Sequence, residues 1–334
     1  MRQIEAGSYY SYLTEGCKLC REGAKLVLFI TGLCNNSCFY CPISEEKRGK
    51  DVVFANERKV VTIDDFVEEV NLMDAEGVAI TGGEPLLKLE RVLEFLKLSD
   101  SLGLHSHLYT SIPAKESVIE SLSKFLDEIR FHPVELKNVG KYEESLVLAK
   151  KHGIEAGFEI PAIDYNSQVV EILNRHDAFL NLNELECSPT NFEALITRNF
   201  EIEDYYVDCN EIAKKYEIVE KFHYCTARFK DSVQFRRRLL RMAHKLANNS
   251  KIYEVTDDGT IVCGFVEGNA KNISKAKKIL RENRLEFVEV ENGIEVSIST
   301  IEKLGEYLKA EGLSLSVIER YPTSKRTVVE VIPL

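Results

Sequence analysis

Several features that would determine location or architecture are missing from this sequence. Its 334 residues contain no uninterrupted apolar run near the ~18 residues that a transmembrane helix needs, and the start, MRQIEAGSYY, has no apolar signal core. The chain also has no internal repeat and no low-complexity tract. These absences argue against a helical membrane protein or a repeat architecture, and we expect a soluble cytoplasmic protein with no membrane partner.

A disulfide framework is absent as well. The nine cysteines are an odd number, and five of them lie between residues 17 and 41. In a chain of this size, such bunching favours metal ligation over disulfide pairing. The length and the 44% hydrophobic composition allow one large α/β domain or two domains.

The net charge of −11 is unevenly distributed. Residues 221–334 carry 20 Lys and Arg against 15 Asp and Glu, which gives +5 and leaves −16 for the rest. We therefore expect any anionic partner to meet the C-terminal third.

Strand-like and helical patterns alternate over the first half of the chain. The predicted strands are 25–32, 78–82, 105–111, 128–133, 155–162 and 179–186, and the predicted helices are 63–75, 87–102, 115–126, 142–151 and 167–175. Repeated βα units imply a parallel sheet with right-handed crossovers. Six units are too few for a closed eight-stranded barrel, so the sequence predicts an α/β fold with a partial (βα)6 barrel and an active face at the C-terminal strand ends.

The rest of the chain divides into further segments. We expect 1–24 to be an N-terminal segment, 25–190 the partial barrel, 191–250 a linking extension with a strand near 218–224 and a basic helix near 231–248, and 251–334 a small α+β domain.

Three cysteines follow the first predicted strand. Cys34, Cys38 and Cys41 are spaced C-x3-C-x2-C in a loop where a parallel sheet places functional groups. Such thiolate clusters are typical of iron–sulfur sites, and three thiolates leave one iron of a cubane open for a small ligand. A zinc knuckle is the alternative, but no fourth ligand stands at matching spacing.

Two motifs together carry a family resemblance. The first is C-x3-C-x-aromatic-C, with Tyr40 as the aromatic residue, and the second is Gly-Gly-Glu-Pro at 82–85 after Thr81. Over roughly residues 25–186 the chain resembles the radical S-adenosylmethionine (radical SAM) enzymes, and most of all archaeal proteins related to the pyruvate formate-lyase activating enzyme.

The resemblance implies a [4Fe-4S] cluster whose open iron chelates S-adenosylmethionine. An electron from a donor of the ferredoxin or flavodoxin type would cleave that molecule, and the 5′-deoxyadenosyl radical would take a hydrogen atom from the substrate. The glycines at 82–83 would let the backbone approach the ligand ammonium. Either Glu84 or the carbonyls of the turn that ends at Pro85 would accept from that ammonium.

Four further residues receive provisional roles from the resemblance. Tyr40 would lie near the adenine, Thr110 and Ser111 would bond the ribose, and Glu159 would face the ribose or the sulfonium. Thr110 and Ser111 are equally well read as ordinary strand-end polar groups, and Glu159 as a buried, paired structural acid.

A second metal site is predicted upstream. Cys17 and Cys20 predict a C-x2-C turn that presents two thiolates to one metal, and another Cys or His pair usually completes such a site. We expect Cys225 as the third ligand and Cys263 as the fourth, with Cys187 as a competitor. An iron–sulfur cluster, a single iron and zinc all stay open, and a disulfide is the rival.

The segment 228–245 is strongly basic. Its cationic residues are Arg228, Lys230, Arg236, Arg237, Arg238, Arg241, His244 and Lys245. With its apolar residues it forms an amphipathic helix that could hold an RNA such as tRNA, or a solvated surface helix paired with nearby acids. The sequence thus leaves two substrate classes: an RNA, or a protein (as for an activase that installs a glycyl radical) or small metabolite.

Overall fold

The computed structural model describes residues 1–334, which fold as two units that are described separately. The large unit comprises residues 1–70 and 75–235, and the small unit comprises residues 71–74 and 236–334. The predicted N-terminal segment is thus part of the large unit, and the predicted linking extension is shared between the two.

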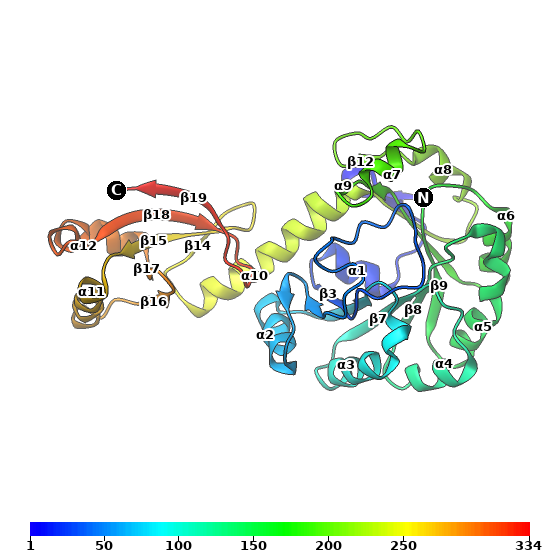
Figure 1. Ribbon diagram of the computed structural model, residues 1–334, viewed down its shortest axis with the longest axis horizontal. Coiled ribbons are helices and arrows are strands. Elements are labelled where there is room, and N and C mark those ends of the chain that lie inside the picture. Colours follow the sequence, from blue (N-terminus) through cyan, green and yellow to red (C-terminus); the bar gives the residue numbers. More distant parts are fainter. The chain divides into compact units, whose positions relative to one another are not determined.

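An open sheet with seven parallel strands organises the large unit (Figure 1). In spatial order the strands are β13 (Lys221–Cys225), β10 (Phe179–Asn183), β9 (Glu155–Pro161), β8 (Glu128–Phe131), β7 (His105–Thr110), β6 (Gly77–Thr81) and β3 (Lys25–Phe29). Short antiparallel strands continue it at both edges: β1 (Arg2–Gln3) and β2 (Tyr9–Tyr10), and β4 (Phe54–Ala55) and β5 (Arg58–Lys59). The predicted α/β class and partial barrel are confirmed.

The seventh parallel strand is a difference from prediction. β13 lies in what the sequence assigned to the linking extension, but its Phe222 and Tyr224 are buried and it pairs in register with β10. Four consecutive residues of β13, from Phe222 to Cys225, are buried, as expected for a parallel strand that is covered on both faces of the main sheet.

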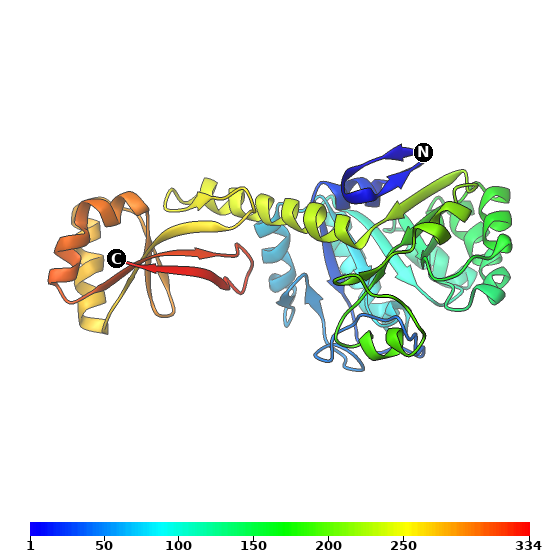
Figure 2. The same ribbon diagram turned by 90° about the horizontal axis from the view of Figure 1, so that it is seen from above.

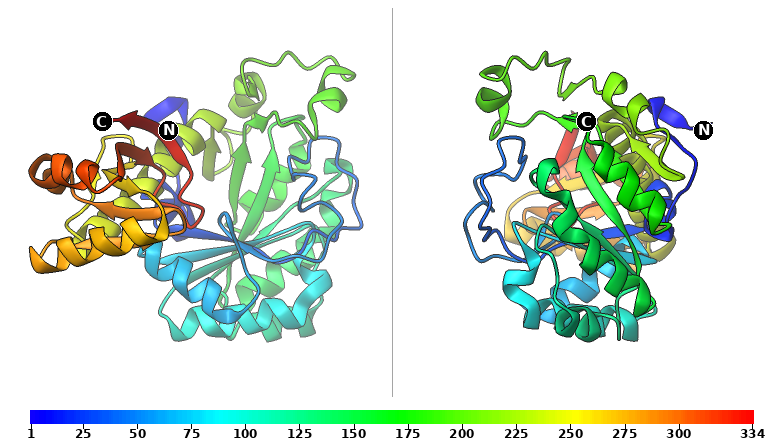
Figure 3. Two further views of the ribbon diagram at one scale, coloured as in Figure 1. Left: turned by 60° about the vertical axis from the view of Figure 1, so that its left-hand side comes forward. Right: turned by 90° about the vertical axis from the view of Figure 1, so that its right-hand side faces the viewer.

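Helices connect the parallel strands on the outer side of the sheet (Figures 1 and 3). They are α2 (Ile63–Met73), α3 (Leu89–Ser101), α4 (Glu116–Leu122), α5 (Glu143–Lys151) and α6 (Ser167–Arg175). In α6, Val169, Val170 and Leu173 are buried at helical spacing, which is why this segment packs on the sheet. The remaining elements are η1 (Glu5–Gly7), η2 (Pro85–Lys88), η3 (Leu136–Tyr142), β11 (Leu185–Glu186), α7 (Phe192–Ile196), β12 (Tyr206–Val207), α8 (Asn210–Lys215), α9 (Ala227–Phe229) and the π-helical turn η4 (Lys230–Phe235).

A short helix, α1 (Glu15–Arg21), packs against the inner side of the sheet. The Thr14 side chain caps it by accepting from Cys17 N at 3.2 Å. A Cβ on Gly16 would lie 2.4 Å from His107 Nδ1 and 2.7 Å from Glu128 Oε2, so glycine permits this close approach. The C-x2-C pair therefore lies on a helix, and the predicted turn is wrong.

The small unit is a sheet with two helices on one face (Figure 2). Its strands run in the order β16 (Phe287–Val290), β17 (Gly293–Val296), β15 (Ile261–Glu267), β18 (Ser314–Arg320) and β19 (Val328–Pro333), with β14 (Glu254–Val255) paired to β15. Helices α11 (Ala270–Glu282) and α12 (Ile298–Ala310) enclose one apolar core.

Helix α10 (Arg236–Asn249) contributes to a second core of the small unit. Ala243 is buried there with Ile261, Cys263 and Ile318. This apolar contact explains why the helix belongs to the small unit, whereas the sequence placed it in the linking extension. No helix in either unit has the length and apolar character required to cross a membrane.

Candidate functional site

A cavity of about 580 Å³ lies where the parallel strands of the large unit end. Every residue predicted to bind the cluster or S-adenosylmethionine lines it: Cys34, Cys38, Tyr40, Cys41, Thr81, Gly82, Gly83, Glu84, Pro85, Thr110, Ser111 and Glu159. These side chains come from the loops or ends of β3, β6, β7 and β9. The placement matches the rule that parallel sheets carry their sites at the carboxyl ends of strands.

The three cysteines of the first loop are free thiols. Cys34 is exposed, while Cys38 and Cys41 are partly exposed. Burial raises the pKa of the Cys38 thiol. No three His, Cys, Asp or Glu side chains are gathered as a ready metal site anywhere in the structure, this loop included. The thiol donor set nevertheless fits an iron–sulfur cluster by residue type.

Backbone hydrogen bonds and close backbone contacts hold the Gly-Gly-Glu-Pro turn to the cysteine loop. Gly83 N donates to Thr31 O at 2.7 Å, and Glu84 N donates to Leu33 O at 2.8 Å. A Cβ would lie 2.6 Å from Thr31 O on Gly82 and 2.4 Å from Leu33 O on Gly83. Glycine is thus required at both positions because the neighbouring backbone is too close for a side chain. The sequence had suggested instead that the glycines make room for a ligand.

Glu84 is buried and fully hydrogen-bonded. Its carboxylate accepts from Leu86 N at 3.1 Å, Thr110 Oγ1 at 2.7 Å, Ser111 N at 2.7 Å and Ser111 Oγ at 2.6 Å. Only 1% of this residue is exposed. The carboxylate and both hydroxyls therefore hold the turn to the end of β7, and the turn carbonyls are the groups left for a ligand ammonium.

Glu159 both lines the cavity and belongs to a buried charge network. Its carboxylate accepts from Arg130 Nη1 at 2.6 Å, Asn181 Nδ2 at 2.9 Å and Asn183 Nδ2 at 2.8 Å. Burial acts to raise the pKa of Glu159, but Arg130 and the two amides outweigh it and lower the pKa. Glu159 is therefore a paired acid whose side chain is 13% exposed, toward the cavity.

Arg130 on β8 and His132 directly after this strand were missed by the sequence reading. Arg130 also contacts Glu128 Oε1 at 2.5 Å, and His132 lies 2.9 Å from Tyr40 Oη through Nε2 and 2.8 Å from Glu159 O through Nδ1. The signal was present in EIRFHP, where Glu128, Arg130 and His132 alternate along one strand and so face one side. Burial lowers the pKa of His132, which favours the neutral imidazole.

The cysteines of the predicted second metal site are largely buried. Cys17 Sγ accepts from Asn181 Nδ2 at 3.1 Å and Arg130 Nη2 at 3.4 Å, and Cys225 is buried at the end of β13. Burial raises the pKa of Cys20 to about 12.

The assignment of Cys263 to that metal site is corrected. This thiol is fully buried in the apolar core of the small unit, beside Ile261 and Ile318, and burial raises its pKa to about 12. It behaves as a small hydrophobic residue. The site that would use Cys17, Cys20 and Cys225 stays a prediction.

The basic segment divides between the two units, and most of its cations have partners. In the large unit Lys230 is bonded to Glu186 at 2.5 Å, and Arg228 lies over the Tyr206 ring at 5.2 Å. In the small unit Lys245 pairs with Asp74 at 2.9 Å, and Arg241 donates to the Asp74 carbonyl. The pairing matches the alternative in which this segment is a structural, charge-paired helix.

Comparison with known proteins decides the family. Residues 28–133 match the radical SAM superfamily, and residues 259–334 match a domain of unknown function, DUF8061. A protein of Methanocaldococcus jannaschii, provisionally named a glycyl-radical enzyme activating enzyme, is 37% identical over 97% of this chain and 94% of its own length. This chain belongs to the radical SAM superfamily.

Two more distant similarities accompany this match. A second M. jannaschii protein with the same provisional name is 26% identical over 54% of this chain and 66% of its own length. The crystal structure of Streptococcus suis SuiB bound to S-adenosylmethionine has a TM-score of 0.41 and 13% identity, over 63% of this chain and 52% of SuiB.

As a radical SAM protein, this chain is an enzyme that uses a [4Fe-4S] cluster and S-adenosylmethionine. The resemblance first drawn from Cys34, Cys38 and Cys41 and from the turn at 82–85 is therefore confirmed.

Proposed function

We propose that Cys34, Cys38 and Cys41 hold the [4Fe-4S] cluster and that the 580 Å³ cavity binds S-adenosylmethionine for hydrogen abstraction from a protein. The single observation that carries this proposal is the convergence of all the motif residues on one cavity. Their convergence from the ends of four strands is what a small-molecule site requires.

The chemistry itself belongs to the cofactors. Held by Cys34, Cys38 and Cys41 and reduced by a ferredoxin- or flavodoxin-type donor, the cluster would supply the electron for reductive cleavage of S-adenosylmethionine, and this cleavage would provide the radical for hydrogen abstraction from the substrate.

The chain supplies orientation and exclusion of water. In our proposal the carbonyls of the turn at 82–83 accept from the ligand ammonium, and the Tyr40 ring, fixed through its hydroxyl by His132, lies beside the adenine. Glu159, fixed by Arg130, presents a carboxylate to the ribose or the sulfonium. Pro42, Ile43, Val134 and Ala194 add apolar wall to the cavity.

We propose a protein as substrate, with a glycine residue of a partner as the hydrogen donor. The support is the provisional name of the relative that matches nearly the full chain. The pairing of Lys230 and Lys245 with acids removes the main argument for an RNA substrate.

Anaerobic reconstitution tests the cofactor assignment. We expect Cys38→Ala to lose acid-labile sulfide and all reductive formation of 5′-deoxyadenosine. Cys209→Ala is the matched control, because Cys209 is buried in the same unit, does not line the cavity and was assigned to neither metal site. Cleavage that persists in Cys38→Ala with normal iron content would contradict the proposal.

Electron paramagnetic resonance tests the substrate class. A protein fraction that yields a glycyl radical signal only with the reconstituted enzyme and S-adenosylmethionine would support the proposal. Hydrogen transfer from added tRNA, with a steep dependence on salt, would replace it with the RNA alternative.

A further inference from the structure

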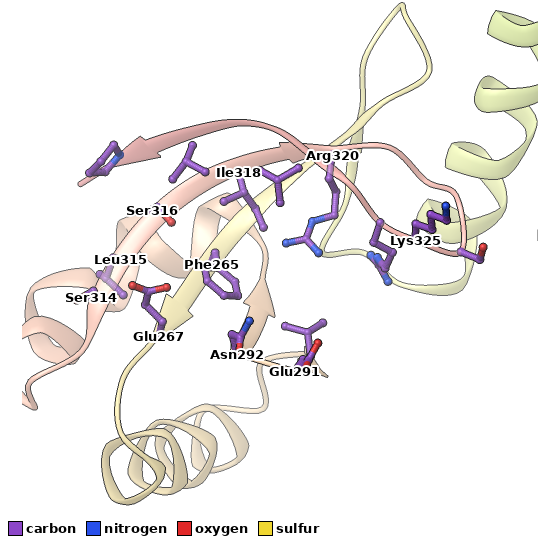
Figure 4. Close-up of a pocket in the computed structure, with 16 residues that line it drawn as sticks. Phe265, Glu267, Glu291, Asn292, Ser314, Leu315, Ser316, Ile318, Arg320 and Lys325 are labelled. Atoms are coloured by element: carbon purple, nitrogen blue, oxygen red, sulfur yellow. The ribbon is translucent and has the colours of Figure 1, made fainter. Parts of the chain in front are cut away.

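The small unit has a cavity of its own, of about 620 Å³ (Figure 4). Its lining comes from β15, β16, β18, β19 and their connecting turns, and none comes from α11 or α12. Phe265 and Ile318 line it, whereas Val266 packs toward the two helices. Because side chains alternate along a strand, the cavity lies on the sheet face that those helices leave uncovered.

Basic residues gather at one end of this cavity. Arg320 Nη1 and Arg326 Nη2 share the fully buried Glu295, at 2.8 Å and 3.1 Å. Two guanidinium groups on one carboxylate leave an excess positive charge, and the Nε of each is buried with no hydrogen-bond partner. Lys325 lines the same end and makes no salt bridge.

The opposite part of the lining is acidic. Glu267 lies beside Ser314, at the end of β18 opposite Arg320 (Figure 4), and Glu291 lies in the turn between β16 and β17. Between the charged groups the lining is largely apolar, with Phe265 and Ile318. The cavity is therefore complementary to an elongated ligand with an anion at one end and a cation at the other.

The strand beside the cavity is an open edge. β19 is the outermost strand and pairs only with β18. Leu334 N donates to Leu315 O at 3.0 Å, so the alternation of an antiparallel ladder directs the N–H and carbonyl of Val331 away from β18. The backbone of Pro333, which has no N–H, is also directed away from β18.

The protection of this edge against pairing is confined to its two ends, where Pro333 has no N–H and the register with β18 shifts near Arg320. Natural edge strands are blunted by charges or coverage, yet β19 has one charged residue, Glu330. Large apolar residues of the strand are about half exposed: Val328, Val329, Val331 and Ile332. An unpaired backbone beside a lined cavity is the arrangement that binds an extended peptide by strand addition.

We propose that β19 and the adjoining cavity bind an extended segment of a partner protein as an added strand. The segment pairs with the free edge of β19, places an acidic side chain near Lys325 and Arg326 in the turn before β19, and directs aliphatic side chains to the cavity face beside Val328 and Val331. A basic side chain at its other end points toward the end of the cavity that holds Glu267. This inference rests on the proposed function, in which the partner is the protein substrate.

The length of the segment follows from strand geometry. β19, the strand with which the segment would pair, has six residues, Val328–Pro333. At ~3.3 Å per residue this is ~20 Å, so about six residues pair, with every second side chain on the cavity face.

The direct test uses a synthetic peptide and the full chain. The probe is fluorescein-labelled Lys-Thr-Val-Thr-Val-Thr-Asp, followed by fluorescence anisotropy. We expect saturable binding that weakens about tenfold when the peptide Asp is replaced by Lys, and about tenfold again for the protein variant Lys325→Glu. Lys303→Glu, at an exposed position of α12, is the matched control and should leave binding unchanged.

Strand addition also predicts that binding depends on which alternate peptide N–H groups are available, and this can be tested without changing the protein. Only alternate peptide N–H groups would face β19, so N-methylation at one set of alternate residues should abolish binding while the other set tolerates it. Val331→Pro, which removes an outward N–H, should weaken the unmodified peptide about tenfold.

Several results would overturn the inference. One is that N-methylation at either set of alternate residues has the same effect on binding. Others are that Lys325→Glu binds the peptide as tightly as Lys303→Glu, or that binding does not saturate up to about 1 mM peptide. A homodimer in light scattering that Val331→Pro dissociates would assign the edge to a second copy of the chain instead. Since peptide binding needs no cluster, it can be measured independently of the assay above, in which persistent S-adenosylmethionine cleavage by Cys38→Ala would defeat the proposed function separately.

Discussion

The interior of the large unit depends on one residue, Arg130. It is 2% exposed and contacts Glu128, Glu159, Tyr109, Thr14 and Cys17. A buried guanidinium without partners would be very costly, so the two carboxylates and the neutral groups around it form one interdependent set. The cavity acid Glu159 is thereby fixed in part by Arg130 and Asn181, which do not line the cavity.

Glu159→Gln should show this dependence. The substitution keeps the shape but removes the charge opposite Arg130, so we expect the free energy of unfolding to fall by about 2 kcal/mol at neutral pH. Urea denaturation measures it. Glu116→Gln, which breaks the exposed pair with Lys151, is the control and should change stability by less than ~0.5 kcal/mol.

The same pair predicts a pH dependence. The pKa of Glu159 is lowered from its ordinary 4.5, so its stabilising effect is complete above that value and is lost as the pH falls through the lower, folded-state pKa. The unfolding free energies of the wild type and Glu159→Gln should therefore differ at pH 7 and converge in acid. A constant difference down to the acid transition would contradict the Arg130 pairing.

Gly83→Ala should separate the two motif loops. Its Cβ would meet Leu33 O at 2.4 Å, so the turn must move away from the cysteine loop, with a stability loss of about 1–3 kcal/mol. We expect S-adenosylmethionine binding, measured by equilibrium dialysis on the reconstituted enzyme, to weaken more than tenfold. Gly140→Ala, which meets only the flexible end of Gln168 at 3.2 Å, is the control, and equal binding by both variants would contradict the prediction.

The residue scale also shows what a single sequence can predict. Cys34 and Gly83 belong to short motifs whose meaning is local, so their place could be predicted. The role of Arg130 depends on Cys17 and Glu159, which lie far away in the chain. Cys263 was misplaced because a thiol in an apolar core and a thiol at a metal look alike in sequence.

Helix α1 is the element whose role the sequence concealed. Its motif was read as a metal-binding turn, whereas the Thr14 cap and the glycine at 16 make it a helix pressed onto strands β7 and β8. Thr14 could have been recognised in the sequence as a helix cap. The contact of the helix with His107 and Glu128 could not be predicted, because it depends on how the sheet curves. By contrast, the parallel strands β3, β6, β7, β8, β9 and β10 were predicted within a few residues, since each repeats the same local pattern.

Helix α12 contains a position where alanine should be better than the native residue. Gly305 lies inside the helix, and an added Cβ would meet Leu315 Cδ1 at an ordinary 3.4 Å. Gly305→Ala should therefore stabilise the small unit by about 0.5–1 kcal/mol through helix propensity. A shift of the thermal midpoint upward measures it, and a downward shift would show that the core near Leu315 has no room.

At the scale of the whole molecule, the two units contain separate cavities with separate linings. The cofactor cavity is made only from residues of the large unit, and the peptide cavity only from residues of the small unit. Ligand binding should accordingly stabilise each unit on its own.

Hydrogen exchange on the reconstituted enzyme can check this separation. S-adenosylmethionine at 100 times its Kd should stabilise the native large unit by about 2.7 kcal/mol and slow amide exchange in β6 and β7. Exchange in β15 and β18 should stay unchanged. Equal slowing in both sets of strands would show that the units respond as one body.

The hydrogen bonds on Glu84 have a thermodynamic consequence. All four donors come from the chain itself, so the turn beside the cavity needs no ligand to become ordered. A binding site that is already ordered loses little conformational entropy when its ligand binds. Calorimetry of S-adenosylmethionine binding should thus give a heat-capacity change that reflects only the apolar area covered, without the larger negative value that accompanies a loop folding around its guest.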